Sequence, residues 1–279
     1  MTTSPPKAPT GDLATFASDT FTSGGVSHVV YRKGTGPTVI VITEMPGISP
    51  MVLGFADRVV ALGCSVALPD LFGEAGRDPN AGSKASVAGY TISSMARACI
   101  SREFTTFAAG KSSPVVTWLR ALAAHEHGAN GGPGVGVVGM CFTGGFALAM
   151  AVDPLVVAPV LSQPSLPFGL TKAHRRSIDT SPADLEVVAG RCAAEGLTVL
   201  GLRFDGDPFV PAERFGYLRE RLGDGFVAVE LQQADGHPDG PLAKHHSVLT
   251  GDLVDEPGAP TRVALDQVLE LFRSKLLEA

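Results

Sequence analysis

The sequence has no run of lysine or arginine residues. Its 22 basic and 28 acidic side chains give a formal net charge of −6 and are spread along the 279 residues. A surface that binds nucleic acid or an anionic membrane needs clustered basic side chains. We therefore expect no nucleic acid and no membrane as a partner, and the default partner is a small molecule.

Long apolar runs are also missing. Residues 1–21 are polar and rich in Pro, Thr and Ser, without the apolar segment that a secretion signal needs. No later window offers the roughly 18 uninterrupted apolar residues of a membrane-spanning helix. We expect a cytoplasmic protein.

Cysteine is scarce. The four cysteines, Cys64, Cys99, Cys141 and Cys192, are too far apart for a Cys-x-x-Cys metal or redox motif. A cytoplasmic chain of this size does not need disulfides, so we expect four free thiols. No group of His, Cys and carboxylate residues has the spacing of metal ligands, so we expect neither a metal nor an organic cofactor.

Short β-branched runs alternate with amphipathic segments along most of the chain. The predicted strands cover residues 26–31, 38–43, 64–68, 136–138, 158–161, 198–204 and 226–231. The predicted helices cover residues 51–62, 112–124, 144–152, 182–195, 211–222 and 261–277. This alternation favours an α/β fold with a largely parallel, twisted sheet and helices on both faces.

One domain is the simplest organisation, because no repeat or interior linker divides the chain. We expect residues 1–22 to form an N-terminal tail that is poorly ordered or packs late, and residues 23–279 to form the domain. Residues 74–94 are rich in Gly, Ala, Ser, Asp and Asn with little periodicity, which predicts a loop or cap around residues 74–110. Both a monomer and a small homo-oligomer are compatible with the sequence.

The segment Gly139-Met140-Cys141-Phe142-Thr143-Gly144-Gly145 lies between a predicted strand and a predicted helix. This is the layout of a nucleophile elbow, in which a strained turn projects the nucleophile and small neighbours let the strand and the helix pass closely. Cys141 is therefore the candidate nucleophile. The backbone N–H groups of Phe142 and Met45 are the candidate oxyanion hole.

The other members of a catalytic triad would follow in the order acid, then histidine. Asp205 and Asp207 are both candidates for the acid. His237, His245 and His246 are candidates for the base. The chain order alone does not choose between them.

Four segments together resemble the dienelactone hydrolase family of the α/β-hydrolase fold. They are the elbow, the strand that ends in Glu44-Met45-Pro46-Gly47, the Pro-Asp-Leu turn at residues 69–71, and Gly206-Asp207-Pro208-Phe209-Val210-Pro211. The resemblance spans roughly residues 26–277. It implies an esterase or lactonase that acts through a Cys-His-Asp triad and an acyl-enzyme intermediate.

The resemblance also selects among the candidates. The family's Asp-x-x-Val-Pro pattern selects Asp207, and its His-Ser pair selects His246, with an insertion at residues 235–244. It further implies that Glu44 helps to generate the thiolate, and that Arg102 meets Glu44 or binds a substrate carboxylate. The alternative for Glu44 is a structural ion pair with a nearby arginine, since a buried carboxylate needs a partner.

Two positions depart from the family pattern. Thr143 stands where the family usually has the second elbow glycine, so the packing beside the nucleophile is expected to differ. Thr250 stands where the family can offer a second arginine for a substrate carboxylate. A dienelactone carboxylate is therefore less assured as the substrate.

Two other interpretations stay open. Gly134-x-Gly136-x-x-Gly139 matches a dinucleotide-binding fingerprint, but that fingerprint follows a strand and opens a helix, whereas these glycines precede or lie in an apolar run. The chain could also be a non-catalytic α/β module in which Cys141 is merely buried. Preferential labelling of Cys141 by iodoacetamide would favour the enzyme.

Overall fold

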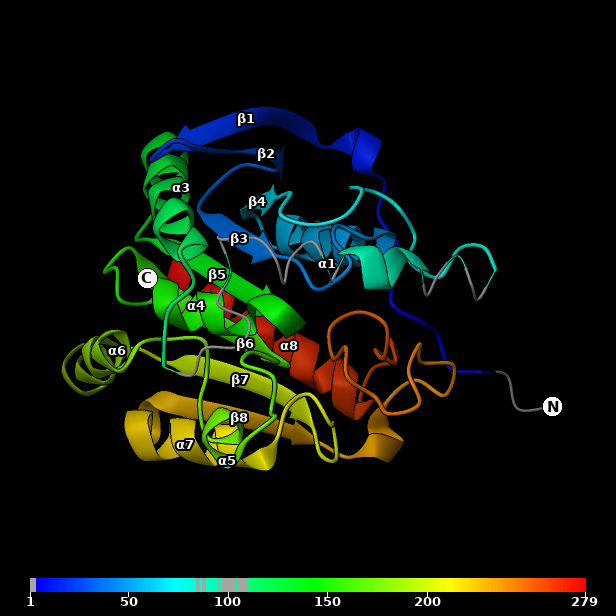
Figure 1. Cartoon of the computed structure of the whole chain (residues 1–279). Coiled ribbons are helices and arrows are strands. Elements are labelled where there is room, and N and C mark those ends of the chain that lie inside the picture. The colour runs from blue at the N-terminus through cyan, green and yellow to red at the C-terminus, as the bar shows by residue number, and fades with distance from the viewer. Residues whose placement is uncertain (1–3, 84–85, 87–88, 95, 97–103, 105–109) are drawn as a thin grey trace.

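An eight-stranded sheet forms the centre of the protein (Figure 1). The structure is a computed structural model that describes residues 4–83, 86, 89–94, 96, 104 and 110–279. The strands are β1 (Ala17–Ser23), β2 (Val26–Lys33), β3 (Thr38–Ile42), β4 (Ser65–Pro69), β5 (Val135–Met140), β6 (Val156–Ser162), β7 (Val199–Phe204) and β8 (Phe226–Leu231). Their order is β1-β2-β4-β3-β5-β6-β7-β8. β2 pairs with both β1 and β4 in the antiparallel sense, and the other neighbouring strands pair in parallel.

Helices cover both faces of this sheet. One face carries α3 (Val115–Asn130), α4 (Gly144–Met150), α6 (Pro182–Glu195) and α7 (Ala212–Leu222), and the other carries α1 (Pro50–Ala61) and α8 (Pro260–Phe272). The short α5 (Lys172–Arg175) precedes α6. The predicted α/β architecture is confirmed. Among the described residues, no helix is both long and apolar enough to cross a bilayer.

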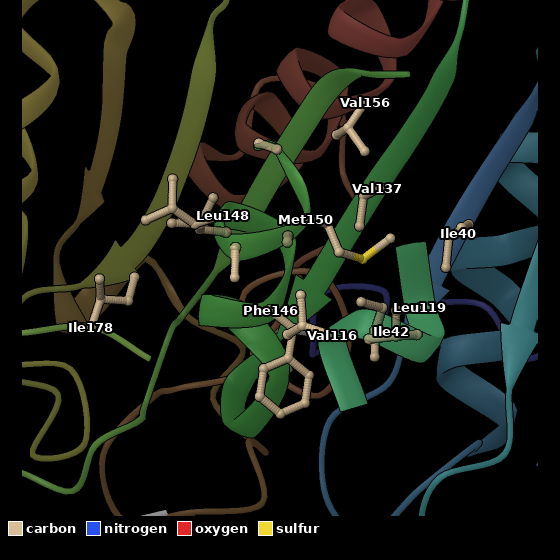
Figure 2. Packing of buried hydrophobic residues seen from close by; sticks show 14 of the residues in the cluster. Ile40, Ile42, Val116, Leu119, Val137, Phe146, Leu148, Met150, Val156 and Ile178 are labelled. Carbon is tan, nitrogen blue, oxygen red and sulfur yellow. The ribbon is translucent and has the colours of Figure 1, made fainter. Parts of the chain in front are cut away.

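Alternation along the strands builds the two cores. Ile40 and Ile42 of β3 point to the face with α3 and α4, whereas Val39 and Val41 point to the face with α1 and α8. Figure 2 shows the first core, in which Phe146 of α4 lies beside Val116 of α3. A central strand that is apolar on both faces is typical of a parallel sheet.

The segment that we expected to be a tail, poorly ordered or packing late, contains a strand. Residues 17–23 form β1, which pairs with β2 across the two-residue turn Gly24-Gly25. Most side chains of this edge strand are exposed, so no apolar periodicity marks it. Further upstream, the carbonyl of Pro6 accepts a hydrogen bond of 2.8 Å from the N–H of Asp255. Within the loop or cap expected at 74–110, residues 89–94 are helical.

Candidate active site

Cys141 lies at the carboxyl end of β5, in a 3-10 turn that leads into α4. Its φ of 54° is in the left-handed region, which is uncommon for a residue other than glycine. A Cβ atom on Gly139 would lie 2.2 Å from the carbonyl oxygen of Thr143, so only glycine allows this turn to close. The sequence prediction of a strand, a tight turn and a helix around Cys141 is confirmed.

Thr143 has a definite structural role at the elbow. Its hydroxyl accepts a hydrogen bond of 2.9 Å from the N–H of Met140 and donates one of 2.8 Å to the carbonyl of Ile42. Met140 ends β5 and Ile42 ends the neighbouring β3, and Thr143 itself is fully buried. A glycine could not make this link, so the departure from the family pattern ties the elbow to the next strand.

An aromatic cluster supports the residue after the nucleophile. The ring of Phe142 meets Phe72, Phe104 and Phe146 edge-on, at centroid distances of 5.4, 5.5 and 6.3 Å. Such edge-to-face contacts favour one orientation of the ring. They hold in place the backbone N–H that we predicted to be part of the oxyanion hole.

Asp207 and His246 come together although 39 positions separate them in the sequence. Asp207 follows β7, His246 follows β8, and the Asp207 Oδ2 atom lies 2.6 Å from His246 Nδ1. The other carboxylate oxygen of Asp207 accepts the N–H of Phe209 at 2.8 Å, and the Phe209 ring packs edge-on against His246. Both members of the pair are buried, which strengthens the hydrogen bond between them.

The environment of His246 favours its protonated form. Burial lowers the pKa of the imidazolium, but the neighbouring Cys141 sulfur and the Asp207 carboxylate raise it by more, so the pKa lies well above its ordinary value of 6.5. Within the described residues, the buried Nε2 atom has no regular hydrogen-bond partner. That nitrogen is therefore available to exchange a proton with Cys141.

The competing candidates have other contacts. His237 is fully buried, and its Nε2 atom donates to the carbonyl of Pro5 at 2.9 Å while Nδ1 accepts the N–H of Asp239 at 3.1 Å. Asp205 accepts the N–H of Gln233 at 3.1 Å. These contacts fix the N-terminal segment and the loop after β8, and neither residue lines the pocket around Cys141.

His245 takes part in a second histidine–aspartate pair. Its Nδ1 atom lies 2.8 Å from Oδ1 of Asp252, which is fully buried. The Oδ2 atom of Asp252 accepts the backbone N–H groups of His246 and Ser247, both at 2.8 Å. Asp252 thus holds the backbone that carries His246. Six positions of irregular loop separate the two residues, so no sequence periodicity marks Asp252.

Glu44 lies in the same pocket but is held by polar groups. Its carboxylate accepts hydrogen bonds from the hydroxyls of Thr250 and Ser247, the latter at 2.8 Å, and from Nε2 of Gln163 at 3.1 Å. No arginine of the described chain pairs with it, and Arg102 lies outside the described residues. Burial raises the pKa of the Glu44 carboxyl above its usual value, although the two hydroxyl donors oppose this effect.

Two further site residues were not found from the sequence. The Ser165 hydroxyl lies 3.5 Å from the Cys141 sulfur, and the Ser165 N–H donates to the carbonyl of Cys141 at 2.9 Å. Gln163, which contacts Glu44, has a φ of 36° and is fully buried. Both follow the end of β6, as Cys141 follows β5, and the adjacency of these two parallel strands is the signal that could have found them.

The pocket has a volume of about 260 Å³. It is lined by the candidate residues Glu44, Met45, Cys141, Phe142 and His246, together with side chains of the surrounding loops. No group of three or more His, Cys, Asp or Glu side chains in the described part of the chain could hold a metal ion. Gly136 and Gly139 lie within β5, so the glycine match does not form a phosphate-binding turn after a strand.

The sheet, the elbow after β5 and the site at the carboxyl ends of the strands define an α/β-hydrolase fold. The profile of the dienelactone hydrolase family matches residues 27–233. The chain therefore belongs to the dienelactone hydrolase family and is a hydrolase of that family. The matched residues include Glu44, Cys141 and Asp207, and end before His246.

Solved structures with the same fold are distant in sequence. A dienelactone hydrolase-like promiscuous phosphotriesterase from metagenomic libraries has 18% identity and a TM-score of 0.60, over 94% of this chain and 98% of its own. A dienelactone hydrolase from Anabaena variabilis has 18% identity and a TM-score of 0.56, with the same coverage of 94% and 98%. A 2,6-dihydroxy-pseudo-oxynicotine hydrolase has 16% identity and a TM-score of 0.55, over 94% of this chain and 68% of its own. A search of curated proteins gave no match.

Proposed function

We propose that this protein hydrolyses a carboxylic ester or lactone through an acyl-enzyme intermediate on Cys141. The observation that carries the proposal is the buried hydrogen bond of 2.6 Å between Asp207 and His246, because His246 lines the same pocket as Cys141. A nucleophile beside a base that a third group orients is the arrangement of covalent hydrolases.

The proposed reaction has two halves. His246 Nε2 takes the thiol proton, the Cys141 sulfur attacks the carbonyl carbon, and the bond to the leaving oxygen breaks as His246 returns the proton to that oxygen. Water then enters, gives a proton to His246 and attacks the thioester carbonyl. The acid leaves, and the sulfur regains the proton from His246. Asp207 holds the ring with Nε2 toward the sulfur throughout.

The developing oxyanion needs fixed donors. We assign this role to the backbone N–H groups of Phe142 and Met45, because both residues line the pocket beside Cys141. The aromatic cluster around Phe142 keeps its donor in place, so little reorganisation accompanies the reaction.

Glu44 supports this chemistry through His246. Its carboxylate accepts the hydroxyl of Ser247, the residue that follows His246, and it interacts electrostatically with the imidazolium. A negative charge near His246 favours the imidazolium that forms when His246 takes the proton of Cys141. Arg102 stays a prediction for a substrate-binding residue.

A panel of p-nitrophenyl esters, lactones and dienelactones tests the proposal. We expect Cys141→Ala to abolish hydrolysis with an unchanged melting temperature, and Cys192→Ala, a substitution at another half-buried thiol, to retain it. Activity should survive EDTA and dialysis. Near wild-type turnover by Cys141→Ala, or failure of iodoacetamide to label Cys141 preferentially, would contradict the proposal and favour a non-catalytic module.

A further inference from the structure

Large apolar side chains surround the mouth of the pocket. Phe209, in the loop between β7 and α7, is 42% exposed, and Leu242, in the loop after β8, is 46% exposed. Met51 and Phe168 add further apolar surface to the lining. Two exposed apolar side chains from separate loops that converge on one pocket form a surface that an apolar group of a ligand would cover.

The charges of the lining residues also favour an uncharged ligand. Among the described lining residues, Glu44 is the only acid, and neither lysine nor arginine occurs. The carboxylate of Glu44 is already bound by Thr250, Ser247 and Gln163. A carboxylate on the substrate would lose its hydration in this pocket without gaining a cationic partner. It would also approach the like charge of Glu44. Both effects are unfavourable.

His246 does not supply the missing cation. Its Nδ1 atom is bound to Asp207, and its Nε2 atom is needed for the proton of Cys141. An imidazolium at this position is already paired with the Asp207 carboxylate. Among the lining residues that the structure describes, a remote carboxylate on the substrate therefore has no cationic partner.

We infer that the pocket takes a small, uncharged ester or lactone whose apolar part contacts Phe209 and Leu242. The inference rests on the proposed hydrolase function and names its substrate class. The volume of about 260 Å³ lies below the roughly 300–1,000 Å³ of sites that enclose drug-sized ligands, which agrees with a small substrate.

A matched pair of esters tests the charge preference. Methyl p-nitrophenyl adipate and p-nitrophenyl hydrogen adipate share the leaving group and the chain, and differ at the far end, which is an uncharged methyl ester in the first and a carboxylate in the second. We expect kcat/KM, corrected for spontaneous hydrolysis, to favour the neutral ester by at least about 100-fold, since an unpaired carboxylate is costly to desolvate. A ratio near one, or a preference for the anion that Arg102→Ala abolishes, would overturn the inference.

A second experiment tests the charge preference by placing a cation in the pocket. We expect Leu242→Arg to reduce the neutral-to-anionic ratio by about tenfold, because the guanidinium can pair with the distal carboxylate. Val187→Arg is the matched control, because Val187 is 47% exposed on α6 and does not line the pocket. An unchanged ratio in a folded Leu242→Arg protein, or an equal change in Val187→Arg, would contradict the placement of the substrate.

Thiol labelling separates this inference from the hydrolase proposal. N-ethylmaleimide and 3-maleimidopropionate react through the same group and differ in distal charge. We expect their rate ratio at Cys141, divided by the ratio for free cysteine, to favour the neutral reagent by at least about tenfold. If no ester or lactone of the panel is hydrolysed, the hydrolase proposal fails and this ratio alone decides the charge preference, with a value near one overturning it.

Discussion

Replacing Thr143 by Val tests the link between the elbow and β3. Valine matches threonine in shape but cannot accept the N–H of Met140 or donate to the carbonyl of Ile42. A buried donor that loses a hydrogen-bond partner costs about 1–3 kcal/mol, and the new methyl group gains little because it faces carbonyl oxygens. We therefore expect a loss of about 2 kcal/mol in the free energy of unfolding.

That loss converts into a measurable shift in melting temperature. With roughly 2.1 cal/mol/K of unfolding entropy per residue, 279 residues give about 590 cal/mol/K, so Thr143→Val should melt about 3–4 °C lower. A displaced elbow should also lower kcat by about 10- to 100-fold. Calorimetry and ester hydrolysis measure the two effects on the same samples.

Thr143→Ser is the matched control because it keeps the hydroxyl and loses only a methyl group. We expect it to retain kcat and to lose about 1 kcal/mol. If Thr143→Val melts at the same temperature as the wild type, or if the two variants have equal kcat, the Thr143 hydroxyl does not position the elbow.

Further predictions concern the residues around the base. His246→Ala should lower kcat by roughly 10²–10⁴-fold, Asp207→Asn should do the same, and the double variant should lose far less than the product. His237→Ala should leave kcat nearly unchanged but lower the melting temperature, and a His237→Ala enzyme as inactive as Cys141→Ala beside an active His246→Ala would reverse the assignment. Asp252→Ala should lower kcat with little change in KM, with partial recovery in Asp252→Asn, because the residue positions the His246 backbone; a change in KM alone would exclude this role. The raised pKa of Glu44 means that the folded state binds its proton more tightly than the unfolded state, so this contribution to stability falls as pH rises above the ordinary value of 4.5. Denaturant unfolding across pH should therefore show wild type losing stability relative to Glu44→Gln as pH rises, and parallel curves would contradict it.

The sequence was sufficient for the parts of the fold that apolar periodicity marks. The runs around Val39, Val137 and Leu200 indicated the central strands because those strands are buried on both faces. β1 was missed because an edge strand exposed to solvent needs no apolar pattern. Its signal was the pair Gly24-Gly25, which is typical of a two-residue hairpin turn.

The site likewise has residues that the sequence could predict and residues that it could not. The elbow around Cys141 was predictable because its glycines are required by local backbone geometry. The position of His246 was not, since the long loop after β8 is placed by tertiary contacts such as those of Asp252 and Gln233. The resemblance to a family selected among three histidines, and the hydrogen bond to Asp207 is formed by the selected one.

The most direct test of the account is the mass of the enzyme during turnover. Rapid mixing with a p-nitrophenyl ester, acid quenching and peptide mapping should show one acyl group on the peptide that contains Cys141, formed and lost at rates compatible with kcat. Ser165 is the matched rival, because its hydroxyl lies 3.5 Å from the Cys141 sulfur. We predict a thioester on Cys141. An acyl group on Ser165, or hydrolysis without any covalent intermediate, would contradict the proposed mechanism.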